Sequence, residues 1–321
     1  MTSSTEYAVR LSDVEIARRR IDGLIHRTPV MHSRLFDERA GRSVFFKCEN
    51  LQRVGAFKMR GAANAVMALD DAAAAKGVLT HSSGNHAQAL ALAARERGIA
   101  AHIVMPENAP AVKRRAVEAY GARVYPCAPT LCARETTARD VQTQTGAAFI
   151  HPYDRAEIIA GQGTCVMELL EEVPDLDAVI APVGGGGLLS GTAIASRALR
   201  AATRVFGAEP AGADDAARSL AAGRLIPQED PRTIADGLLT SLGILTWPIV
   251  RDHVEAILTV PDEATIAAMR LVMGRLKIVI EPSAAVAVAA VLDDAFPPPG
   301  QIARVGVVLS GGNVDLDHLP W

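Results

Sequence analysis

Short runs of β-branched residues alternate along this chain with longer stretches in which Ala, Leu and Arg recur at a helical spacing. The short runs predict strands at Val44–Lys47, Val78–His81, His102–Met105, Arg123–Tyr125, Val179–Val183, Arg204–Ala208, Ala256–Val260 and Arg304–Leu309. The longer stretches predict helices at Val14–Asp22, Phe57–Ala68, Asn85–Glu96, Ala111–Ala119, Ala133–Gln144, Glu157–Glu171, Leu188–Leu199, Asp262–Leu276 and Ser283–Ala290. Such alternation is typical of parallel sheets covered by helices on both faces, so we expect an α/β fold with doubly wound parallel sheets.

The periodic pattern breaks at two places, which we interpret as crossings between domains. The segment HPYDRAEIIAGQG, from His151 to Gly163, places a His-Pro pair and two glycines between predicted strands. The Ala-rich stretch Asp70–Lys76 marks an earlier crossing. The predicted large domain therefore comprises residues 1–70 and 152–321, and residues 71–151 form a smaller domain inserted in it.

The composition narrows the classes of partner. With 321 residues, of which 49% are hydrophobic and 21% charged, the chain is long enough for one large or two ordinary folded domains. A formal net charge of -3 and only 4% aromatic residues offer neither a basic surface for a phosphate backbone nor stacking platforms for bases. Nucleic acid is therefore not an expected partner.

The chain also shows no signal for secretion, membrane insertion or disulfide bonding. Its first residues, MTSSTEYAVRLSD, lack a basic and then apolar pattern, and the longest apolar run, Ala284–Leu292, is too short to span a bilayer. We therefore expect a cytoplasmic protein without membrane contact. The cysteines form no CxxC pair and have no histidine at zinc-ligand spacing, so neither a disulfide framework nor a zinc site is predicted.

A buried-type strand that runs into four consecutive glycines and then into a helix is the most distinctive local feature. These glycines are Gly184–Gly187 in the segment VIAPVGGGGLLSG. Residues without Cβ let successive backbone N–H groups converge, and the helix N-terminus adds the positive end of a dipole, so an anion such as phosphate can be held there. A simple tight turn is the alternative, but four glycines exceed what one left-handed position requires.

The same glycines allow another interpretation, a dinucleotide-binding fingerprint, because Glu209 follows at the end of the next strand. The spacing argues against it. A G-x-G-x-x-G pattern that starts at Gly184 ends on Leu189, and one that starts a residue later ends on Ser190. The third glycine, which close packing of the helix needs, is missing.

A lysine opens the helix in the segment ENLQRVGAFKMRGAANAV. Lys58 follows Phe57 there. The helix dipole and an apolar neighbour both disfavour the ammonium form, which lowers the pKa of a lysine and makes it a nucleophile for carbonyl carbons. Taken alone, such a residue is usually a surface lysine that extends to water.

Two further strand ends carry hydroxyl, amide and glycine groups. One is THSSGNHAQAL, which offers side-chain donors at Ser82, Ser83, Asn85 and His86 where a helix begins. A plain helix N-cap is the alternative interpretation for this loop. The other is VVLSGGN, which contains Ser310. Because the carboxyl ends of parallel strands share one edge of a sheet, where open α/β folds bind ligands, we expect these loops to meet.

Four of these segments, GAFKMRGA, SSGNHAQAL, GGGGLLSG and VVLSGGNVD, occur in one order over essentially the whole chain. In this set the chain resembles the fold-type II pyridoxal-phosphate enzymes, and within them the family of serine racemase and the short serine/threonine dehydratases. The intervening segments AEPAGADD, TIADGL and TWPIVRD extend the resemblance. It implies a tryptophan-synthase-β-like fold with two domains and pyridoxal 5'-phosphate (PLP) as cofactor.

The resemblance assigns cofactor-binding roles residue by residue. Lys58 would form a Schiff base with PLP and later move the proton at the substrate Cα, while Phe57 packs beside the ring and Asn85 hydrogen-bonds its hydroxyl group. The phosphate cradle would consist of Gly184, Gly185, Gly186, Gly187 and Leu188. Ser310 would face the pyridine nitrogen, and a hydroxyl at that place keeps the nitrogen largely unprotonated, which suits β-elimination better than transamination.

The resemblance also assigns substrate and metal ligands. The substrate would be held by Ser82, Ser83, Asn85, His86 and Arg134. Ser83 would act on the face of Cα opposite to the lysine, and racemisation requires acids on both faces. The divalent cation, Mg²⁺ or alternatively Ca²⁺ or Mn²⁺, would be bound by Glu209, the carbonyl of Ala213 and Asp215. Glu281 matches a family position near the cofactor without an assigned role.

We therefore expect a homodimeric PLP-dependent ammonia-lyase that converts L-serine or L-threonine into a 2-oxo acid and ammonia, with or without serine racemisation. An alternative with the same chemistry acts on L-threo-3-hydroxyaspartate or another β-hydroxy amino acid. From other classes, a nicotinamide oxidoreductase built on the glycine turn and a cofactor-bound protein without turnover remain alternatives.

Overall fold

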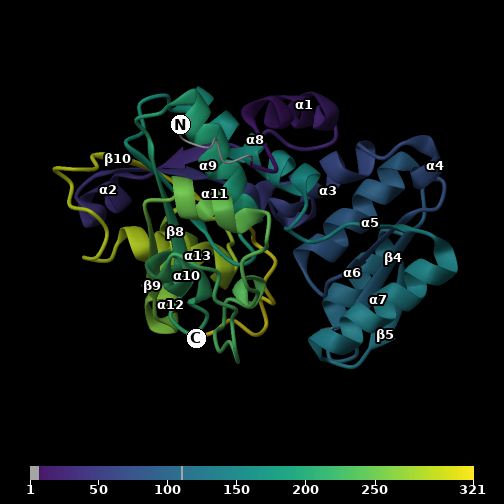
Figure 1. The fold of residues 1–321 in the computed structure, drawn as a ribbon. Helices are drawn as coiled ribbons and strands as arrows, with labels where there is room; N and C mark the ends of the chain where they lie inside the picture. Colours follow the sequence, from purple (N-terminus) through teal and green to yellow (C-terminus); the bar gives the residue numbers. More distant parts are fainter. Residues whose placement is uncertain (1–6, 110) are drawn as a thin grey trace.

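The computed structural model describes residues 7–109 and 111–321 and contains two β-sheets (Figure 1). The larger sheet has the strand order β1-β2-β10-β7-β8-β9, and the smaller has the order β5-β4-β3-β6. The strands are β1 Val30–His32, β2 Ser43–Lys47, β3 Val78–His81, β4 Ala101–Pro106, β5 Arg123–Cys127, β6 Ala148–Phe149, β7 Ala178–Pro182, β8 Arg204–Pro210, β9 Ala256–Val260 and β10 Arg304–Val308. All eight predicted strands are present.

Helices connect and cover these strands. The α-helices are α1 Leu11–Ile21, α2 Arg34–Ala40, α3 Lys58–Met67, α4 Asp71–Ala74, α5 Asn85–Arg97, α6 Ala111–Ala119, α7 Leu131–Thr145, α8 Ala156–Glu172, α9 Gly187–Leu199, α10 Asp215–Ala222, α11 Thr246–His253, α12 Asp262–Arg275 and α13 Pro282–Val291. Short 3₁₀ turns are η1 Glu49–Leu51, η2 Arg53–Gly55 and η3 Asp236–Leu238. Each of the nine predicted helices coincides with one of these α-helices to within a few residues.

The order of the strands makes the smaller sheet an insertion in the larger one. Strands β3 to β6 follow one another in the chain, whereas β2 pairs in parallel with β10, with Phe45 opposite Gly306. Both ends of the chain therefore build the larger sheet, and the expected two-domain α/β fold is confirmed. The domain bounds stay a prediction, since α3 packs both against α5 of the smaller domain and against α8.

Strand β1 differs from the expected parallel arrangement. It pairs with β2 in antiparallel fashion, with Met31 opposite Phe46, and so forms an edge of the larger sheet. A strand of three residues has too few positions for an alternating pattern, which is why the sequence does not predict it.

Apolar side chains fill both faces of the larger sheet. On one face Phe46, Ile180 and Phe206 pack with α12 and α13, and every residue of α13 is buried. On the other face Val179 and Val205 pack with α8 and α9. In the part of the chain that the structure describes, no helix is long and apolar enough to cross a membrane.

Glycines bring three helices of the larger domain into direct backbone contact. A Cβ on Gly161 of α8 would lie 2.6 Å from the Cα of Gly61 on α3, and a Cβ on Gly191 of α9 would lie 2.5 Å from the nitrogen of Gly163. Only glycine allows such a close approach. Helix α8 thereby fixes α3, which begins at Lys58, relative to α9, which follows the glycine run.

Candidate active site

The predicted loops meet at the carboxyl ends of the parallel strands. The Phe57 N–H donates to the carbonyl of Ser310 over 3.0 Å, and Ala56 forms an isolated β-bridge with Gly311. The turn before α3 is thereby joined to the end of β10. Asn313, three residues beyond Ser310, donates to the side chain of Asn85 at the start of α5. These contacts bring three of the four predicted segments together.

Lys58 is the first residue of α3 and is partly buried. Its ammonium donates to the carbonyl of Pro152 over 3.0 Å and lies 5.1 Å from the centre of the Phe57 ring. Burial lowers the pKa of Lys58 to about 8, while the carboxylate of Glu281 opposes this effect. At physiological pH this lysine therefore has a much larger fraction of the neutral, nucleophilic amine than an ordinary lysine has.

The glycine run forms a turn into which side chains would not fit. Gly186 adopts φ +84°, a left-handed conformation, and α9 begins at the next residue. A Cβ on Gly185 would lie 2.2 Å from the ring of Tyr153, and a Cβ on Gly184 would lie 3.1 Å from the carbonyl of Gly237. The Thr246 hydroxyl donates to the Gly185 carbonyl over 2.9 Å and holds the turn in place. The result is a backbone cradle at a helix N-terminus, as an anion site requires.

The loop before α5 carries the next set of predicted polar groups. The Ser82 N–H donates to the carbonyl of Val104, and Ser83 and Asn85 are partly buried. His86 is buried, and its Nε2 lies 3.2 Å from the carbonyl of Ile150. Burial lowers the pKa of His86 well below 6.5, so this residue offers a neutral imidazole rather than a cation.

Glu281, to which the sequence analysis assigns no role, is buried among these loops. Its carboxylate accepts hydrogen bonds from Asn85 Nδ2 at 2.9 and 3.1 Å and from the Asn313 N–H at 3.2 Å. Burial raises the pKa of Glu281 to about 7. Its hydrogen-bonding partners lie far away in sequence, so no local pattern could have revealed them.

Arg134 lies on α7 of the smaller domain and faces the end of β3. Burial, and to a smaller extent the charge of Arg134, lowers the pKa of His81, the last residue of that strand. The guanidinium Nε of Arg134 is buried without a hydrogen-bonding partner among the described residues. The rings of His81 and His151 lie 6.2 Å apart. A cation and two imidazoles therefore gather near the Ser82–His86 loop.

The predicted metal ligands lie at a different place, between β8 and α10. Both oxygens of the buried Glu209 carboxylate accept backbone N–H groups, from Ala216 at 3.1 Å and from Ala217 at 2.9 Å. Asp215 Oδ2 accepts from the Leu242 N–H, but no group among the described residues hydrogen-bonds to the buried Asp215 Oδ1. Burial and the charge of Asp215 raise the pKa of Glu209 to about 9, and burial raises the pKa of Asp215 to about 6.

This arrangement fits a missing cation only in part. Two buried carboxylates that disfavour each other's ionisation, one with an unused oxygen, are suited to a hard divalent ion. Among the described residues, however, no cluster contains three or more acidic, histidine or cysteine ligands, so backbone carbonyls such as that of Ala213 and water would have to complete the coordination.

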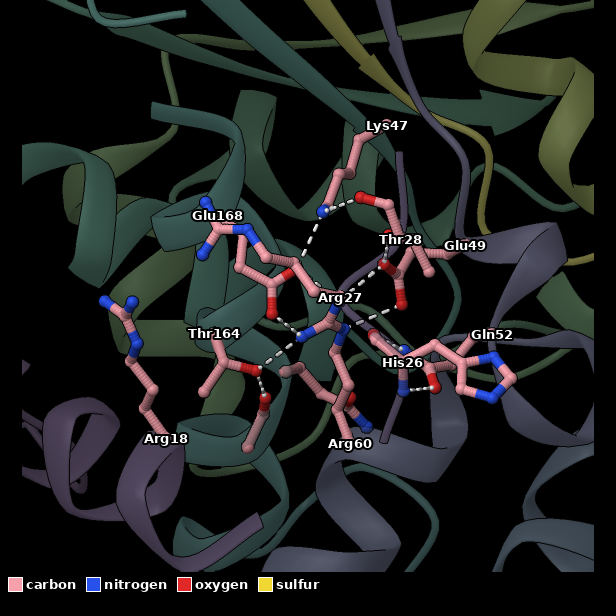
Figure 2. A network of polar contacts seen from close by, with 12 residues as sticks. Arg18, His26, Arg27, Thr28, Lys47, Glu49, Gln52, Arg60, Thr164 and Glu168 are labelled. Carbon is pink, nitrogen blue, oxygen red and sulfur yellow. Dashed lines mark hydrogen bonds and ion pairs between the residues drawn. The ribbon is translucent and has the colours of Figure 1, made fainter. Parts of the chain in front are cut away.

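A network of four buried charged residues surrounds Arg60, which follows Lys58 by two residues on α3 (Figure 2). The sequence analysis does not predict this network. It consists of Lys47, Glu49, Arg60 and Glu168, and we call it the buried quartet. Arg60 Nε donates to Glu49 over 2.7 Å, and Arg60 Nη1 donates to Glu168 over 2.8 Å. Lys47 Nζ also donates to Glu168, over 2.6 Å. The quartet ties β2, η1, α3 and α8 together.

Residues 21–311 match the family model described as "Pyridoxal-phosphate dependent enzyme". The chain belongs to this family. The protein is thus a PLP-dependent enzyme, and the features above fit the cofactor: a lysine with a lowered pKa, a glycine cradle from which side chains are excluded, and the buried Ser310 beside them.

Relatives within the family include racemases and dehydratases. The chain is 48% identical to a serine racemase of Dictyostelium discoideum, with 97% of each protein covered. It is 50% identical to a beta-hydroxyaspartate dehydratase of Paracoccus denitrificans, with 98% of this chain and 99% of that protein covered. The structure of maize serine racemase superposes with a TM-score of 0.96 at 48% identity, covering 97% of this chain and 95% of the other. PLP-dependent β-elimination or racemisation therefore fits this chain.

Proposed function

We propose that this enzyme removes the hydroxyl group and the amine from a β-hydroxy amino acid, L-serine or L-threonine, to give a 2-oxo acid and ammonia, and that it also racemises serine. The observation that carries the proposal is Lys58, which begins a helix, has a lowered pKa and is joined by α8 to the glycine cradle. Similarity to serine racemase and to beta-hydroxyaspartate dehydratase supports both reactions.

We assign the cofactor to the residues predicted from the sequence. Gly184–Gly187 and the backbone N–H of Leu188 would hold the phosphate, Lys58 would carry the covalent attachment, and Asn85 and Ser310 would face polar atoms of the ring. Only the backbone of Leu188 serves, since its side chain is buried in the core around α9. When bound, PLP supplies an electron-withdrawing ring that stabilises negative charge at the substrate Cα.

The chain itself supplies the proton transfers. The Lys58 amine takes the proton from Cα on one face, and its pKa of about 8 leaves a substantial fraction neutral at physiological pH. In elimination, the proton that Lys58 took from Cα is passed to the β-hydroxyl group, which leaves as water, and water then hydrolyses the released enamine to the 2-oxo acid and ammonia. In racemisation, the Ser83 hydroxyl donates a proton to the opposite face, because a single base returns a proton only to its own face. Because the His86 imidazole is neutral, it is not a cation that would pair with the substrate carboxylate. The N–H groups and hydroxyls of the Ser82–His86 loop would bind that carboxylate instead.

A substrate with a second carboxylate, such as 3-hydroxyaspartate, is the second candidate. The observation in its favour is the guanidinium of Arg134. Its Nε has no hydrogen-bonding partner among the described residues, and its charge contributes to lowering the pKa of His81. A planar cation of this kind binds a carboxylate well. The beta-hydroxyaspartate dehydratase from Paracoccus denitrificans is also 50% identical to this chain.

We also propose a Mg²⁺ or Ca²⁺ ion at Glu209, the Ala213 carbonyl and Asp215, on the ground of the unused, buried Asp215 Oδ1.

A homodimer and a cytoplasmic location remain proposals as well. In support of a dimer, Leu51 and Val279 are exposed apolar residues, and the side chain of Asn50, the neighbour of Leu51, donates to the Val279 carbonyl; a second copy would cover them.

An assay for 2-oxo acid across L-serine, L-threonine and threo-3-hydroxyaspartate tests the proposed function. Lys58→Ala should reduce turnover by at least about 10²–10⁴-fold, the range that one acid-base group contributes. Lys76→Ala, which changes an exposed lysine of the smaller domain, should retain full activity. Activity that survives Lys58→Ala would reject the assignment.

The two reactions are separated by Ser83→Ala. This variant should lose formation of D-serine from L-serine, as measured by chiral chromatography, while it keeps much of the elimination to pyruvate. D-serine formation that persists in the variant would show that another group protonates the second face. If the unmodified enzyme forms no D-serine, it is a dehydratase only.

A further inference from the structure

The side-chain amide of Asn85 is held in one orientation by hydrogen bonds that no local sequence pattern contains. The chain of contacts starts at the carbonyl of Val54, a group that can only accept. Asn313 Nδ2 donates to this carbonyl over 2.7 Å and also to Asn85 Oδ1 over 2.9 Å. The other end of the Asn85 amide, Nδ2, donates to both carboxylate oxygens of Glu281.

Each link excludes the reversed amide. If the Asn85 side chain were rotated by half a turn, its Nδ2 would face Asn313 Nδ2, and its Oδ1 would face the Glu281 carboxylate. Donor would then meet donor at Asn313, and acceptor would meet acceptor at the ionised carboxylate of Glu281, which is only 4% exposed. Glu281 is itself fixed, since the backbone N–H of Asn313 donates to its Oε2 over 3.2 Å.

The backbone around Asn313 is shaped for this contact. Val54, whose carbonyl anchors the chain of hydrogen bonds, has φ +57°, a left-handed conformation that is unfavourable for a β-branched residue. A Cβ on the next residue, Gly55, would lie 2.6 Å from Asn313 Oδ1. The strained turn ends three residues before Lys58, so the same segment orients Asn313 and leads into the lysine.

We propose that Glu281 and Asn313 are positioning residues that make Asn85 an obligate N–H donor toward the cofactor. The two oxygens of the Glu281 carboxylate lie at similar distances from Asn85 Nδ2 and can share one of its two hydrogens, so the second N–H of Asn85 remains available to the cofactor. Such a donor favours an ionised oxygen over a neutral hydroxyl group. Asn85 therefore selects PLP in the form whose ring oxygen is negatively charged. This inference rests on the proposed function, which places Asn85 against that oxygen.

A double-mutant cycle on cofactor affinity tests it, with PLP as the probe and equilibrium dialysis as the measurement. Glu281→Gln removes the charge and leaves one acceptor where Asn85 Nδ2 now meets two, so the contact with Asn313 alone then holds the Asn85 amide in its orientation. PLP binding should weaken by about three- to tenfold, the worth of one hydrogen bond. In an Asn85→Ala background the same substitution should change PLP affinity by less than about twofold, because Glu281 acts through Asn85.

The controls separate positioning from general damage. Glu168→Gln changes a carboxylate of similar burial in the buried quartet and should leave the PLP absorption band at its unmodified wavelength, whereas Glu281→Gln should shift it. Asn313→Ala should act like Glu281→Gln and replaces it if that variant does not fold. Equal loss of affinity with and without Asn85, or no loss at all, would overturn the inference. Failure of the unmodified protein to bind PLP would instead reject the proposed function, and the inference with it.

Discussion

Lys58 and Arg60 lie two residues apart on helix α3, yet their surroundings are opposite. Arg60 donates to both carboxylates of the buried quartet, with four bonds of 2.7 to 2.8 Å. Burial alone would lower the pKa of Arg60, but Glu49 and Glu168 raise it well above its usual value. Lys58 donates to the carbonyl of Pro152, a neutral group, and burial lowers its pKa to about 8.

The difference shows how one helix serves both the scaffold and the chemistry. Where carboxylates accompany a cation into the interior, the charge is kept and the helix is anchored. Where carboxylates are absent, burial lowers the pKa of the cation and makes its neutral, basic form easier to reach. Glu281 is the nearest carboxylate to influence Lys58, and it acts through space while its oxygens serve Asn85 and Asn313.

The largest expected effect comes from breaking the quartet. Glu168→Ala leaves Lys47 and part of Arg60 unpaired in the interior, which should lower the free energy of unfolding by about 3–5 kcal/mol. The measurement is denaturant unfolding of the cofactor-free protein. Glu171→Ala, one turn further along α8, removes exposed contacts with Arg18 and Arg27 and should cost less than about 1 kcal/mol. Equal losses in the two variants would contradict the contrast between paired interior charges and surface pairs.

A smaller effect of opposite sign is expected at Lys58. Because its pKa falls from 10.5 to about 8 on folding, the cost of burying its charge is fully present below pH 8 and disappears as the pH rises toward 10.5. Lys58→Met removes that cost. The cofactor-free variant should therefore be more stable than the unmodified protein at pH 7, on the order of 1–3 kcal/mol, and this advantage should shrink by pH 10.

Denaturant unfolding at the two pH values checks this prediction. Lys76→Met, at an exposed position, should show no such pH-dependent gain. An advantage of Lys58→Met that is the same at pH 7 and pH 10 would indicate better packing by methionine rather than relief of a buried charge.

The smallest effect concerns Glu209 and Asp215, where like charges are buried together instead of opposite ones. Millimolar Mg²⁺ or Ca²⁺ should raise the melting temperature by about 2–4 °C, and EDTA should reverse the change. Asp215→Asn keeps an acceptor for the Leu242 N–H but loses the charge, so it should abolish the response. The exposed neighbour Asp214, which pairs with Arg218, provides the control Asp214→Asn with an unchanged response. A response that persists in Asp215→Asn would place the ion elsewhere.

The contrast also explains what could be predicted from the sequence. Local sequence patterns reveal Lys58, the glycine run and the loop before α5, because the chemistry needs particular residue types at a strand end or a helix start. The partners of Arg60 and Asn85 do not, since Glu168 is 108 residues away from Arg60 and Glu281 is 196 residues away from Asn85. Strand β6 was not predicted for another reason: it has only two residues, which are too few to show an alternating pattern of apolar and polar positions.

Backbone contact at Gly61, Gly161, Gly163 and Gly191 has a consequence for how new specificities arise in this scaffold. The spacing between the lysine and the glycine cradle is set by main-chain atoms, which most substitutions do not alter. Ser83 and Arg134, which we assign to the substrate, belong to the smaller domain. Neither residue takes part in the contacts between these glycines. We therefore expect exchanges at Ser83 or Arg134 to change which amino acid is bound while the backbone contacts that fix the cofactor site stay the same.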